Sequence, residues 1–282
     1  MIDQSKISEF IAAALQEDVG PGDHTSNACI DPRSRSQAVL LVKDTGVIAG
    51  VDLAKAIFSH VDPTAQVDIM ITDGSDIAFG NEAFRVSCNT LALLQAERIV
   101  LNTMQRMSAI ATLSSRFAVE VEGLDVTILD TRKTTPLIRF LEKWAVEIGG
   151  CTNYRNGLYD WIMIKDNHID ASGGITASIQ NVNRYLAQNN LDLGITIEVR
   201  NLVELHEVLE SGGITRIMLD NFEIPLLREA VHTVAGRFQT EASGGIKLQN
   251  VRAYAETGIN YISVGALTHS SGSLDLSLKI LK

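Results

Sequence analysis

Cysteine, long apolar runs and positive charge are all scarce in this chain of 282 residues. Its three cysteines, Cys29, Cys88 and Cys151, are widely separated and form no Cys-x-x-Cys pair, so neither a disulfide framework nor a zinc site is predicted. No stretch approaches the roughly 18 apolar residues of a membrane-spanning helix. Segment 1–6 carries acidic and polar groups where a secretory signal would have a basic region and an apolar core. We therefore expect a cytoplasmic protein with no membrane partner.

Positive charge is outnumbered, because 24 lysines and arginines face 34 acids and give a formal net charge of −10. Non-specific binding to nucleic acid requires a basic surface, so no nucleic-acid partner is expected. The hydrophobic content of 45% is ample for a large core and indicates one or two domains. In such an acidic chain, a local cluster of cations is informative.

The N-terminal part of the chain predicts a small α+β unit followed by a long helix. Helical spacing of apolar residues predicts a helix over 7–15, and a second helix is expected near 51–60. From about 90 to 121 the apolar residues indicate one long helix that is buried or lies at a subunit interface. Strands separated by Gly/Asp turns are predicted over 37–42, 67–71 and 83–87.

After this helix, apolar runs alternate with helical segments, which predicts a parallel sheet and an α/β fold. No Gly-x-Gly-x-x-Gly follows any of the runs, so a barrel is favoured over an open doubly wound sheet. The segment is short for eight βα units, which need about 250 residues, and this predicts an incomplete (β/α) barrel. The expected strands are 126–129, 161–164, 195–199, 216–219, 239–242 and 261–264.

Four cations gather where two of these predicted strands end. Arg132 and Lys133 follow run 126–129, Lys165 follows run 161–164, and Arg155 lies between the two runs. Bringing several cations out of bulk water costs several kcal/mol per ion unless an anion pairs with them. The sequence therefore predicts a site that receives a polyanion.

Strand alternation places two of these lysines near two acids. Successive residues of a strand face opposite sides, and Glu198 and Asp220 stand opposite the aliphatic residues of their strands. If the aliphatic faces meet the helices, Lys133, Lys165, Glu198 and Asp220 line one cavity at the carboxyl ends of the strands. Structural salt bridges inside the barrel are the alternative, but they leave the two arginines of the cluster unexplained.

Three Ser-Gly-Gly triplets are candidates for a phosphate-binding loop. Triplet 243–245 follows a predicted strand and precedes a helical stretch over 248–256, so its backbone N–H groups could cradle an anion, with Gly265 supplying the other half. Triplet 211–213 follows a helical stretch and is interpreted as a helix stop. Triplet 172–174 follows no predicted strand and is interpreted as a loop before a helix.

In combination, these segments resemble the quinolinate phosphoribosyltransferase family over nearly the whole chain. The resemblance implies transfer of a phosphoribosyl group from phosphoribosyl pyrophosphate (PRPP) to quinolinate with decarboxylation, which yields nicotinate mononucleotide, pyrophosphate and CO2 in NAD biosynthesis. It also implies an N-terminal open-faced α/β sandwich over 1–110, an incomplete barrel over 111–268 and a segment 269–282 that packs back on the sandwich. The matching segments are 17–23, 97–98, 101–102, 130–136, 149–160, 164–168, 219–221, 241–245 and 263–267.

The resemblance also implies a role for individual residues. Lys133, Glu198 and Asp220 are expected to be catalytic, and the two acids are expected to hold Mg²⁺, directly or through water. The protein is expected to be a homodimer in which the partner subunit donates Arg98 to each site. Quinolinate is assigned to Arg98, Thr131, Arg132, Lys133, Tyr154, Arg155 and Lys165. PRPP is assigned to Glu198, Asp220, Ser243, Gly244, Gly245, Val264 and Gly265.

Two positions depart from the family pattern. Tyr154 stands where the family usually has His, and it keeps an aromatic face and a hydroxyl but is not cationic near pH 7. Leu137 stands where glycine is common. His168 is expected to be a structural hydrogen-bonding residue rather than a base.

Three rival hypotheses remain open at this stage. A non-catalytic or molybdenum-associated pyrophosphorylase-like relative usually lacks the Lys-Asp-Asn-His run found at 165–168. A Schiff-base aldolase would use Lys165 as its nucleophile. A nicotinate phosphoribosyltransferase would meet a monocarboxylate, for which the number of cations is excessive.

Overall fold

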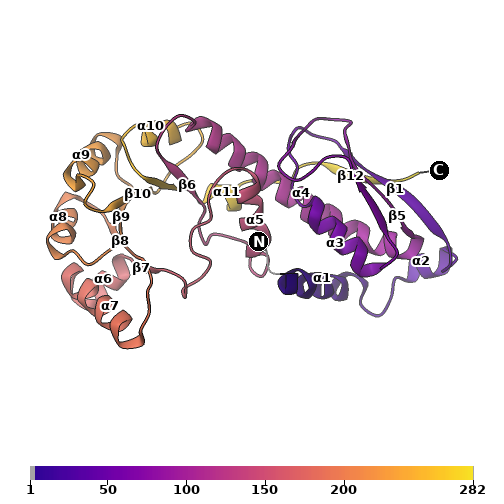
Figure 1. The fold of residues 1–282 in the computed structure, drawn as a ribbon, viewed down its shortest axis with the longest axis horizontal. Coiled ribbons are helices and arrows are strands. Elements are labelled where there is room, and N and C mark those ends of the chain that lie inside the picture. The colour runs from indigo at the N-terminus through magenta and orange to yellow at the C-terminus, as the bar shows by residue number, and fades with distance from the viewer. Residues whose placement is uncertain (1–3, 282) are drawn as a thin grey trace. The chain divides into compact units, whose positions relative to one another are not determined.

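The computed structural model describes residues 4–281, so the first three residues of the polar start segment lie outside it. The chain forms two compact units, and Figure 1 follows it from α1 to β12. Each unit is assembled from segments that are far apart in the sequence. Unit 1 contains the chain up to Ser115, Phe140–Gly150 and the segment from Ser271 onward, and unit 2 contains Arg116–Arg139 and Cys151–Ser270.

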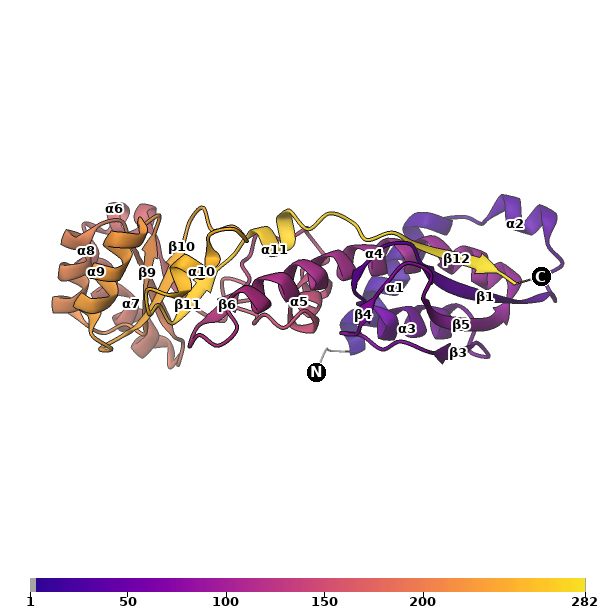
Figure 2. The same ribbon diagram turned by 90° about the horizontal axis from the view of Figure 1, so that it is seen from above.

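Unit 1 is built on a four-stranded antiparallel sheet with the order β12-β1-β5-β3. Figure 2 shows these strands side by side. Ala38 and Leu40 of β1 are fully buried and point to one face, because alternate residues of a strand share a face. The strands are Arg35–Val42 (β1), Gln66–Ile69 (β3), Glu82–Asn89 (β5) and Leu276–Ile280 (β12), and a separate ribbon pairs Gly46–Val47 (β2) with Asp76–Ile77 (β4).

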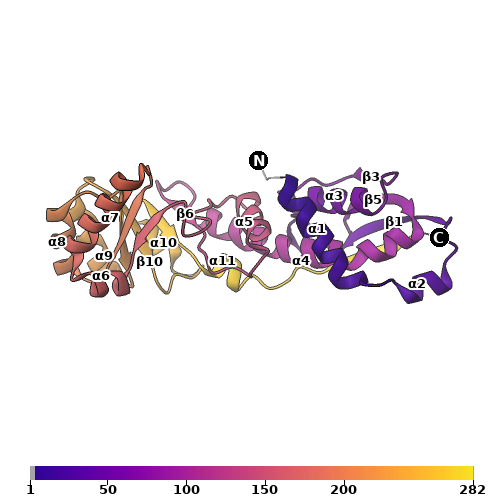
Figure 3. The ribbon, with the colours of Figure 1, turned by 90° about the horizontal axis from the view of Figure 1, so that it is seen from below.

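Helices pack on this sheet and complete the unit. Helix α3 (Val51–Val61) contacts β3 and β5, and the rings of Phe58 and Phe84 meet edge to face with centroids 6.0 Å apart. Helix α1 (Gln4–Val19) packs on α3, as Figure 3 shows. The predicted α/β sandwich is confirmed.

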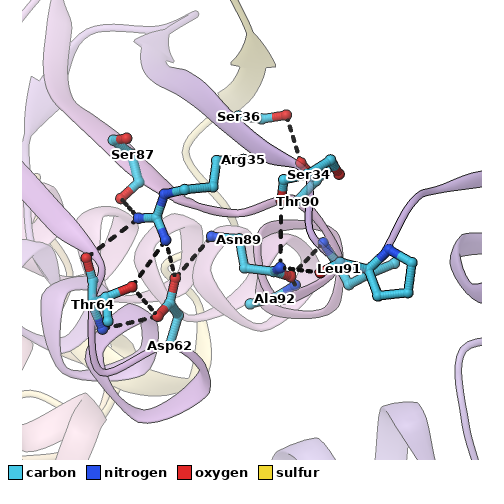
Figure 4. Close-up of polar contacts among 11 residues, drawn as sticks. Ser34, Arg35, Ser36, Asp62, Thr64, Ser87, Asn89, Thr90, Leu91 and Ala92 are labelled. Carbon is cyan, nitrogen blue, oxygen red and sulfur yellow. Dashed lines mark hydrogen bonds and ion pairs between the residues drawn. The ribbon is translucent and has the colours of Figure 1, made fainter.

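A polar network fixes the start of the long helix α4 (Thr90–Glu120), as Figure 4 shows. The side-chain oxygen of Asn89 accepts hydrogen bonds from the backbone N–H groups of Leu91 and Ala92 at 3.0 and 3.2 Å. The buried carboxylate of Asp62 accepts one from the backbone N–H of Asn89 at 2.8 Å, and this bond is the main reason that the pKa of Asp62 is lowered. Side-chain oxygens thus satisfy N–H groups that the first helical turn leaves without partners.

Unit 2 contains six parallel strands in the order β6-β11-β10-β9-β8-β7, so the predicted parallel sheet and incomplete barrel are confirmed. Figure 1 shows α8 and α9 along the outer side of the strands. The strands are Thr127–Leu129 (β6), Ile162–Ile164 (β7), Ile195–Val199 (β8), Arg216–Asp220 (β9), Gln239–Ser243 (β10) and Tyr261–Ser263 (β11). The helices are Asp166–Ser172 (α6), Ile175–Asn189 (α7), Leu202–Ser211 (α8), Ile224–Val234 (α9), Val251–Ala255 (α10) and Ala266–His269 (α11).

The barrel is incomplete because β6 and β7, which follow one another in the chain, lie at opposite edges of the sheet. Helix α5 (Arg139–Ile148), which connects them, belongs to unit 1 except for its first residue. The chain then runs beside β6: the N–H of Thr152 donates to the carbonyl of Ile128 at 2.9 Å, and the N–H of Asp130 donates to the carbonyl of Thr152 at 3.1 Å. This short stretch extends the sheet without forming a full strand.

The glycine triplets have three different places in unit 2. Gly212 ends α8 with a positive φ of 62°, as the interpretation of a helix stop predicted. Gly173 ends α6 and Gly174 begins α7, so triplet 172–174 joins two helices. Triplet 243–245 begins with the last residue of β10. The helix after it is shorter than predicted, because the backbone N–H of Lys247 donates to the side chain of Asn250 and forms a turn there.

Candidate active site

The carboxyl ends of β7, β8 and β9 bring together three of the charged residues that strand alternation predicted. Lys165 directly follows β7, and its Nζ lies 2.6 Å from Glu198 Oε2 on the neighbouring strand β8. The side chain of Lys165 is 44% exposed and that of Glu198 only 10% exposed. Asp220 ends β9 on the other side of β8. One of the salt bridges of the alternative hypothesis is therefore present, between Lys165 and Glu198.

Asp220 is held by two donors from neighbouring segments. The hydroxyl of Ser243 donates to Oδ1, and the side-chain amide of Asn221 donates to Oδ2 at 2.6 Å. Ser243 stands opposite Asp220 in the register of β9 and β10. The first residue of the Ser-Gly-Gly loop and the carboxylate therefore form one hydrogen-bonded group.

Lys133 lies beyond the end of β6 and is exposed. Its backbone N–H donates to Thr131 Oγ1 at 3.0 Å, and its carbonyl accepts from Thr268 Oγ1 at 2.8 Å. Its side chain passes over Gly265, since a Cβ at Gly265 would lie 3.0 Å from Lys133 Cδ and 3.2 Å from the ring of His269. His269 was not singled out from the sequence, because nothing near it in the chain marks a site.

The two arginines of the cluster line a cavity of about 630 Å³. Burial lowers the pKa of Arg155, and the positive charge of Arg132 lowers it further. Within residues 4–281, neither arginine forms an ion pair, and the buried Nε of Arg132 has no hydrogen-bond partner. The cavity is lined by Arg132, Arg155, Leu158, Trp161, Ile162, Met163, Ile164, Lys165, Asn167, His168, Ala171, Ser172, Ser178, Asn181 and Val182.

His168 takes part in the backbone structure of this wall. Its Nδ1 accepts a hydrogen bond from the backbone N–H of Lys165 at 3.0 Å, at the start of helix α6. This agrees with the predicted structural role of His168 and fixes the turn from which Lys165 projects.

The side chain of Tyr154 points toward strands β8 and β9, where it contacts Thr196 and Arg216. Its backbone N–H donates to Asp130 Oδ1 at 2.8 Å, and its hydroxyl is hydrogen bonded to Oγ1 of the fully buried Thr196 at 2.6 Å. The Nε1–H of Trp161 donates to the same Thr196 oxygen at 2.8 Å. Burial raises the pKa of Tyr154, and the negative charge of Glu241 raises it further, so the hydroxyl stays neutral.

A buried ion pair lies next to the ring of Tyr154. The sequence alone did not predict it. Arg216 Nη1 lies 3.1 Å from Glu241 Oε2, and neither side chain is more than 7% exposed. The guanidinium of Arg216 lies 5.0 Å from the ring centroid of Tyr154 and 3.6 Å from that of Tyr261. Burial raises the pKa of Glu241. The available signal was the alternation of β9, which puts Arg216 on the same face as Asp220.

The loop after Lys133 contains a strained residue and a tether. Leu137 has a positive φ of 67° and is 95% exposed. Such a left-handed backbone suits glycine and costs other L-residues roughly 1–2 kcal/mol. Arg139 donates from Nε to Thr134 Oγ1 at 2.8 Å and from Nη1 to the carbonyl of Asn156 at 2.6 Å. Arg139 thus ties the loop that carries two of the cations to the loop that carries Arg155.

The remaining predicted residues are distributed as follows. Thr131 shapes the loop around Lys133 through the bond given above. Val264 is 1% exposed, and its backbone N–H donates to the carbonyl of Leu129 at 2.9 Å. Gly244 and Gly245 have positive φ values of 92° and 64°. Arg98 is exposed on α4 in unit 1, whereas the other predicted site residues belong to unit 2.

Sequence and structure comparisons identify close relatives. The family description "Quinolinate phosphoribosyl transferase, N-terminal domain" matches residues 23–108, and the corresponding "C-terminal domain" matches residues 110–279. "Quinolinate phosphoribosyltransferase [decarboxylating] 1b" of Nicotiana tabacum is 46% identical over 285 residues, covering 96% of this chain and 81% of the relative. "Nicotinate-nucleotide pyrophosphorylase [carboxylating], chloroplastic" of Arabidopsis thaliana is 47% identical over 289 residues, covering 97% and 82%.

The fold of this chain is also similar to that of a solved structure. The crystal structure of NadC from Streptococcus pyogenes superposes with a TM-score of 0.92 at 32% identity, covering 100% of this chain and 99% of that one. Among the described residues, no helix is both long and apolar enough to cross a membrane.

Proposed function

The chain belongs to the quinolinate phosphoribosyltransferase family, and from this premise we propose which of its residues bind each substrate. The family reaction transfers the phosphoribosyl group of PRPP to quinolinate with loss of CO2, in the biosynthesis of NAD. This chain is accordingly a decarboxylating pentosyltransferase. The observation that carries the assignment is the pair Arg132 and Arg155, two cations on one cavity that no acid of the described chain pairs with.

Quinolinate binds at this cation cluster. Its two carboxylates stand on adjacent ring carbons, and two guanidinium forks with lysine point charges suit such a dicarboxylate. Arg132 and Arg155 supply the forks, and Lys133 and Lys165 supply the point charges. The hydroxyl of Tyr154 is already bonded to Thr196, so Tyr154 would contact quinolinate through its ring. Thr131 contributes by shaping the loop of Lys133.

PRPP binds at the ends of the adjoining strands. Asp220 and Glu198 take the ribose hydroxyls, and the 5-phosphate lies on the backbone N–H groups of Ser243, Gly244 and Gly245. Positive φ values at both glycines support this assignment, because turned backbone can direct successive N–H groups at an anion. Two further residues, Val264 and Gly265, contribute main-chain groups from the end of β11.

The pyridine nitrogen of quinolinate attacks the anomeric carbon of PRPP. The new N–C bond forms as the C–O bond to pyrophosphate breaks, and the sugar carries positive charge in the transition state. The carboxylate beside the now cationic nitrogen then leaves as CO2, and its electron pair stays on the ring carbon, which takes a proton. No covalent enzyme nucleophile is needed, so Lys133, Glu198 and Asp220 act by position and charge.

The two acids also suit Mg²⁺. No group of three or more His, Cys, Asp or Glu side chains close enough to hold a metal occurs among the described residues. Mg²⁺ prefers one or two carboxylates with phosphate oxygens and water, which fits Glu198 and Asp220 together with the pyrophosphate of PRPP. When bound, the ion neutralises negative charge on the leaving pyrophosphate.

The proposal includes a homodimer in which the partner subunit supplies Arg98. Its support is the exposure of Arg98 on the long helix α4. We place the protein in the cytoplasm, and the support is that Cys29, Cys88 and Cys151 are all free thiols. One of the two plant relatives is named as chloroplastic.

Release of pyrophosphate tests the chemistry directly. The assay contains the purified protein, PRPP, Mg²⁺ and either quinolinate or nicotinate. We expect release with quinolinate, little with nicotinate, and none after chelation with EDTA until Mg²⁺ is restored. Release with neither acid would contradict the proposed reaction, and equal release with both acids would contradict the assignment of the cation cluster to a dicarboxylate.

Subunit complementation tests the donated arginine. Arg98→Ala and Lys133→Ala proteins are each expected to be nearly inactive, since every site lacks one group. After mixing and subunit exchange, half of the dimers are hybrids with one intact site in two, so activity should return to about a quarter of that of the wild type. A tagged subunit verifies that subunit exchange has taken place. If activity does not return after verified exchange, the donation of Arg98 is refuted.

A further inference from the structure

We infer that Asn221 is a positioning residue, which fixes the carboxylate of Asp220 relative to the Ser-Gly-Gly loop and so sets the geometry of the PRPP site. The inference rests on the proposed function, in which Asp220 and loop 243–245 bind two parts of the same substrate.

The backbone of Asn221 is the first reason. Its φ is +55°, in the left-handed region that few residues other than Gly, Asn and Asp adopt. In this conformation its N–H donates to the carbonyl of Ser243 at 2.8 Å. The bond extends the pairing of β9 with β10 by one step beyond the register of Asp220 with Ser243. The turn after β9 is therefore anchored on the first residue of the glycine loop.

The side chain of Asn221 is the second reason. Its amide donates to Asp220 Oδ2 at 2.6 Å, while the hydroxyl of Ser243 donates to Oδ1. Both oxygens of the carboxylate thus have a donor, so the carboxylate cannot rotate without breaking a hydrogen bond. Both donors are neutral, so neither hydrogen bond places a cation beside Asp220. Each oxygen also retains acceptor capacity for the ribose or for Mg²⁺.

The glycine loop gives the third reason. A Cβ at Gly244 would overlap the amide oxygen of Asn221 and would lie 3.0 Å from its backbone nitrogen. At Gly245, by contrast, a Cβ would have no atom of the described chain within 4 Å. The two glycines therefore differ in what they accommodate: Gly244 makes room for Asn221, and Gly245 leaves open space for a ligand.

These three contacts connect the two ends of one substrate. In the proposed complex Asp220 binds the ribose and loop 243–245 binds the 5-phosphate. Asn221 contacts both of these protein groups, through Asp220 and through Ser243. If Asn221 loses its amide, the carboxylate of Asp220 keeps only the hydrogen bond from Ser243 and can rotate about it, so binding of PRPP should weaken. Quinolinate binds at the cations and does not contact this turn, so its affinity should not change.

Asn221→Gly isolates the amide, because glycine keeps the left-handed backbone and removes the side chain. Asn190→Gly is the matched control, since Asn190 has a φ of +52°, is exposed and ends α7. We expect Asn221→Gly to raise the KM for PRPP about tenfold, while the Kd for quinolinate and the melting temperature stay near those of the wild type. Asn190→Gly should leave all of these quantities unchanged.

Gly244→Ala provides a second test from the other side of the contact. It should also raise the KM for PRPP. The double variant Asn221→Gly with Gly244→Ala should lose less than the sum of the two single losses, because part of each loss comes from the same contact, while the strain of alanine at a φ of 92° belongs to Gly244→Ala alone. A KM for PRPP within twofold of wild type in Asn221→Gly, an equal loss of quinolinate affinity, or additive losses would overturn the inference. A wild-type protein without activity would refute the proposed function instead.

Discussion

Replacement of Tyr154 by phenylalanine separates two roles for this residue. The substitution removes one hydroxyl and keeps the ring, so the ring stays near Trp161 and Arg216. The hydroxyl is hydrogen bonded to Oγ1 of Thr196, which is fully buried and also accepts a bond from Trp161. Thr196 therefore loses one of two partners in a place that water does not reach.

The expected loss of stability follows from this geometry. Removing one partner of a buried hydrogen bond costs about 1–2 kcal/mol when the other group keeps a second bond. For a chain of this size that corresponds to a decrease in Tm of roughly 2–6 °C. Because the ring is kept, the KM for quinolinate should change less than about threefold.

Calorimetry and steady-state kinetics measure the two quantities on the same preparations. Tyr159→Phe is the matched control, since Tyr159 belongs to the same loop and is 73% exposed, and it should change neither quantity. A tenfold increase in KM for quinolinate with an unchanged Tm would refute the reasoning, because it would mean that the hydroxyl binds the substrate and not Thr196.

The pH dependence of stability gives an independent check. Burial and the charge of Glu241 raise the pKa of Tyr154 above its ordinary value near 10. The unfolded chain therefore loses the phenolic proton at lower pH than the folded chain does. The contribution of the neutral hydroxyl is complete below about pH 10 and decreases as pH rises above it. The difference in unfolding free energy between wild type and Tyr154→Phe, measured with urea, should thus stay constant up to about pH 10 and shrink as the pH rises further.

Three further predictions concern other contacts. Lys133→Ala should lower kcat about a hundredfold or more with an unchanged circular dichroism spectrum, and near-normal turnover would contradict its role. Arg139→Gln should raise the KM for quinolinate about fivefold but not the KM for PRPP, because it releases the tether between the two cation loops; the exposed Arg33→Gln serves as the control. Arg216→Met should destabilise the protein by about 3–5 kcal/mol in urea denaturation by leaving Glu241 buried and unpaired, and addition of Glu241→Gln should recover part of this loss.

Much of the fold could be predicted from the period of the apolar residues. Strand β8 has the predicted bounds, and β9 and β10 each extend one residue beyond them. Helix α4 was predicted to within one residue because 31 residues carry many repeats of the helical pattern. The short helices α6 and α11 were not predicted, because one or two turns give too few repeats for the pattern to be recognised.

The site could be predicted where its chemistry follows strand alternation. Lys165 and Glu198 were expected on one face and form an ion pair. The pair of Arg216 with Glu241 was missed, since alternation gives the face of a residue but not its partner two positions along the next strand. The left-handed turn at Asn221 was also missed. Its conformation depends on Gly244, more than twenty positions away, and no local pattern encodes that dependence.

The pairing of β12 with β1 has a consequence for synthesis on the ribosome. Val42 pairs with Leu276, so the second partner of β1 is translated only after all of unit 2. At about 5–20 residues per second, β1 waits on the order of 10–50 s with one open edge, and such edges can pair with other chains. Nascent or truncated chains that stop before Leu276 are therefore the forms most exposed to aggregation, and chaperone binding to unit 1 would be most valuable during this interval.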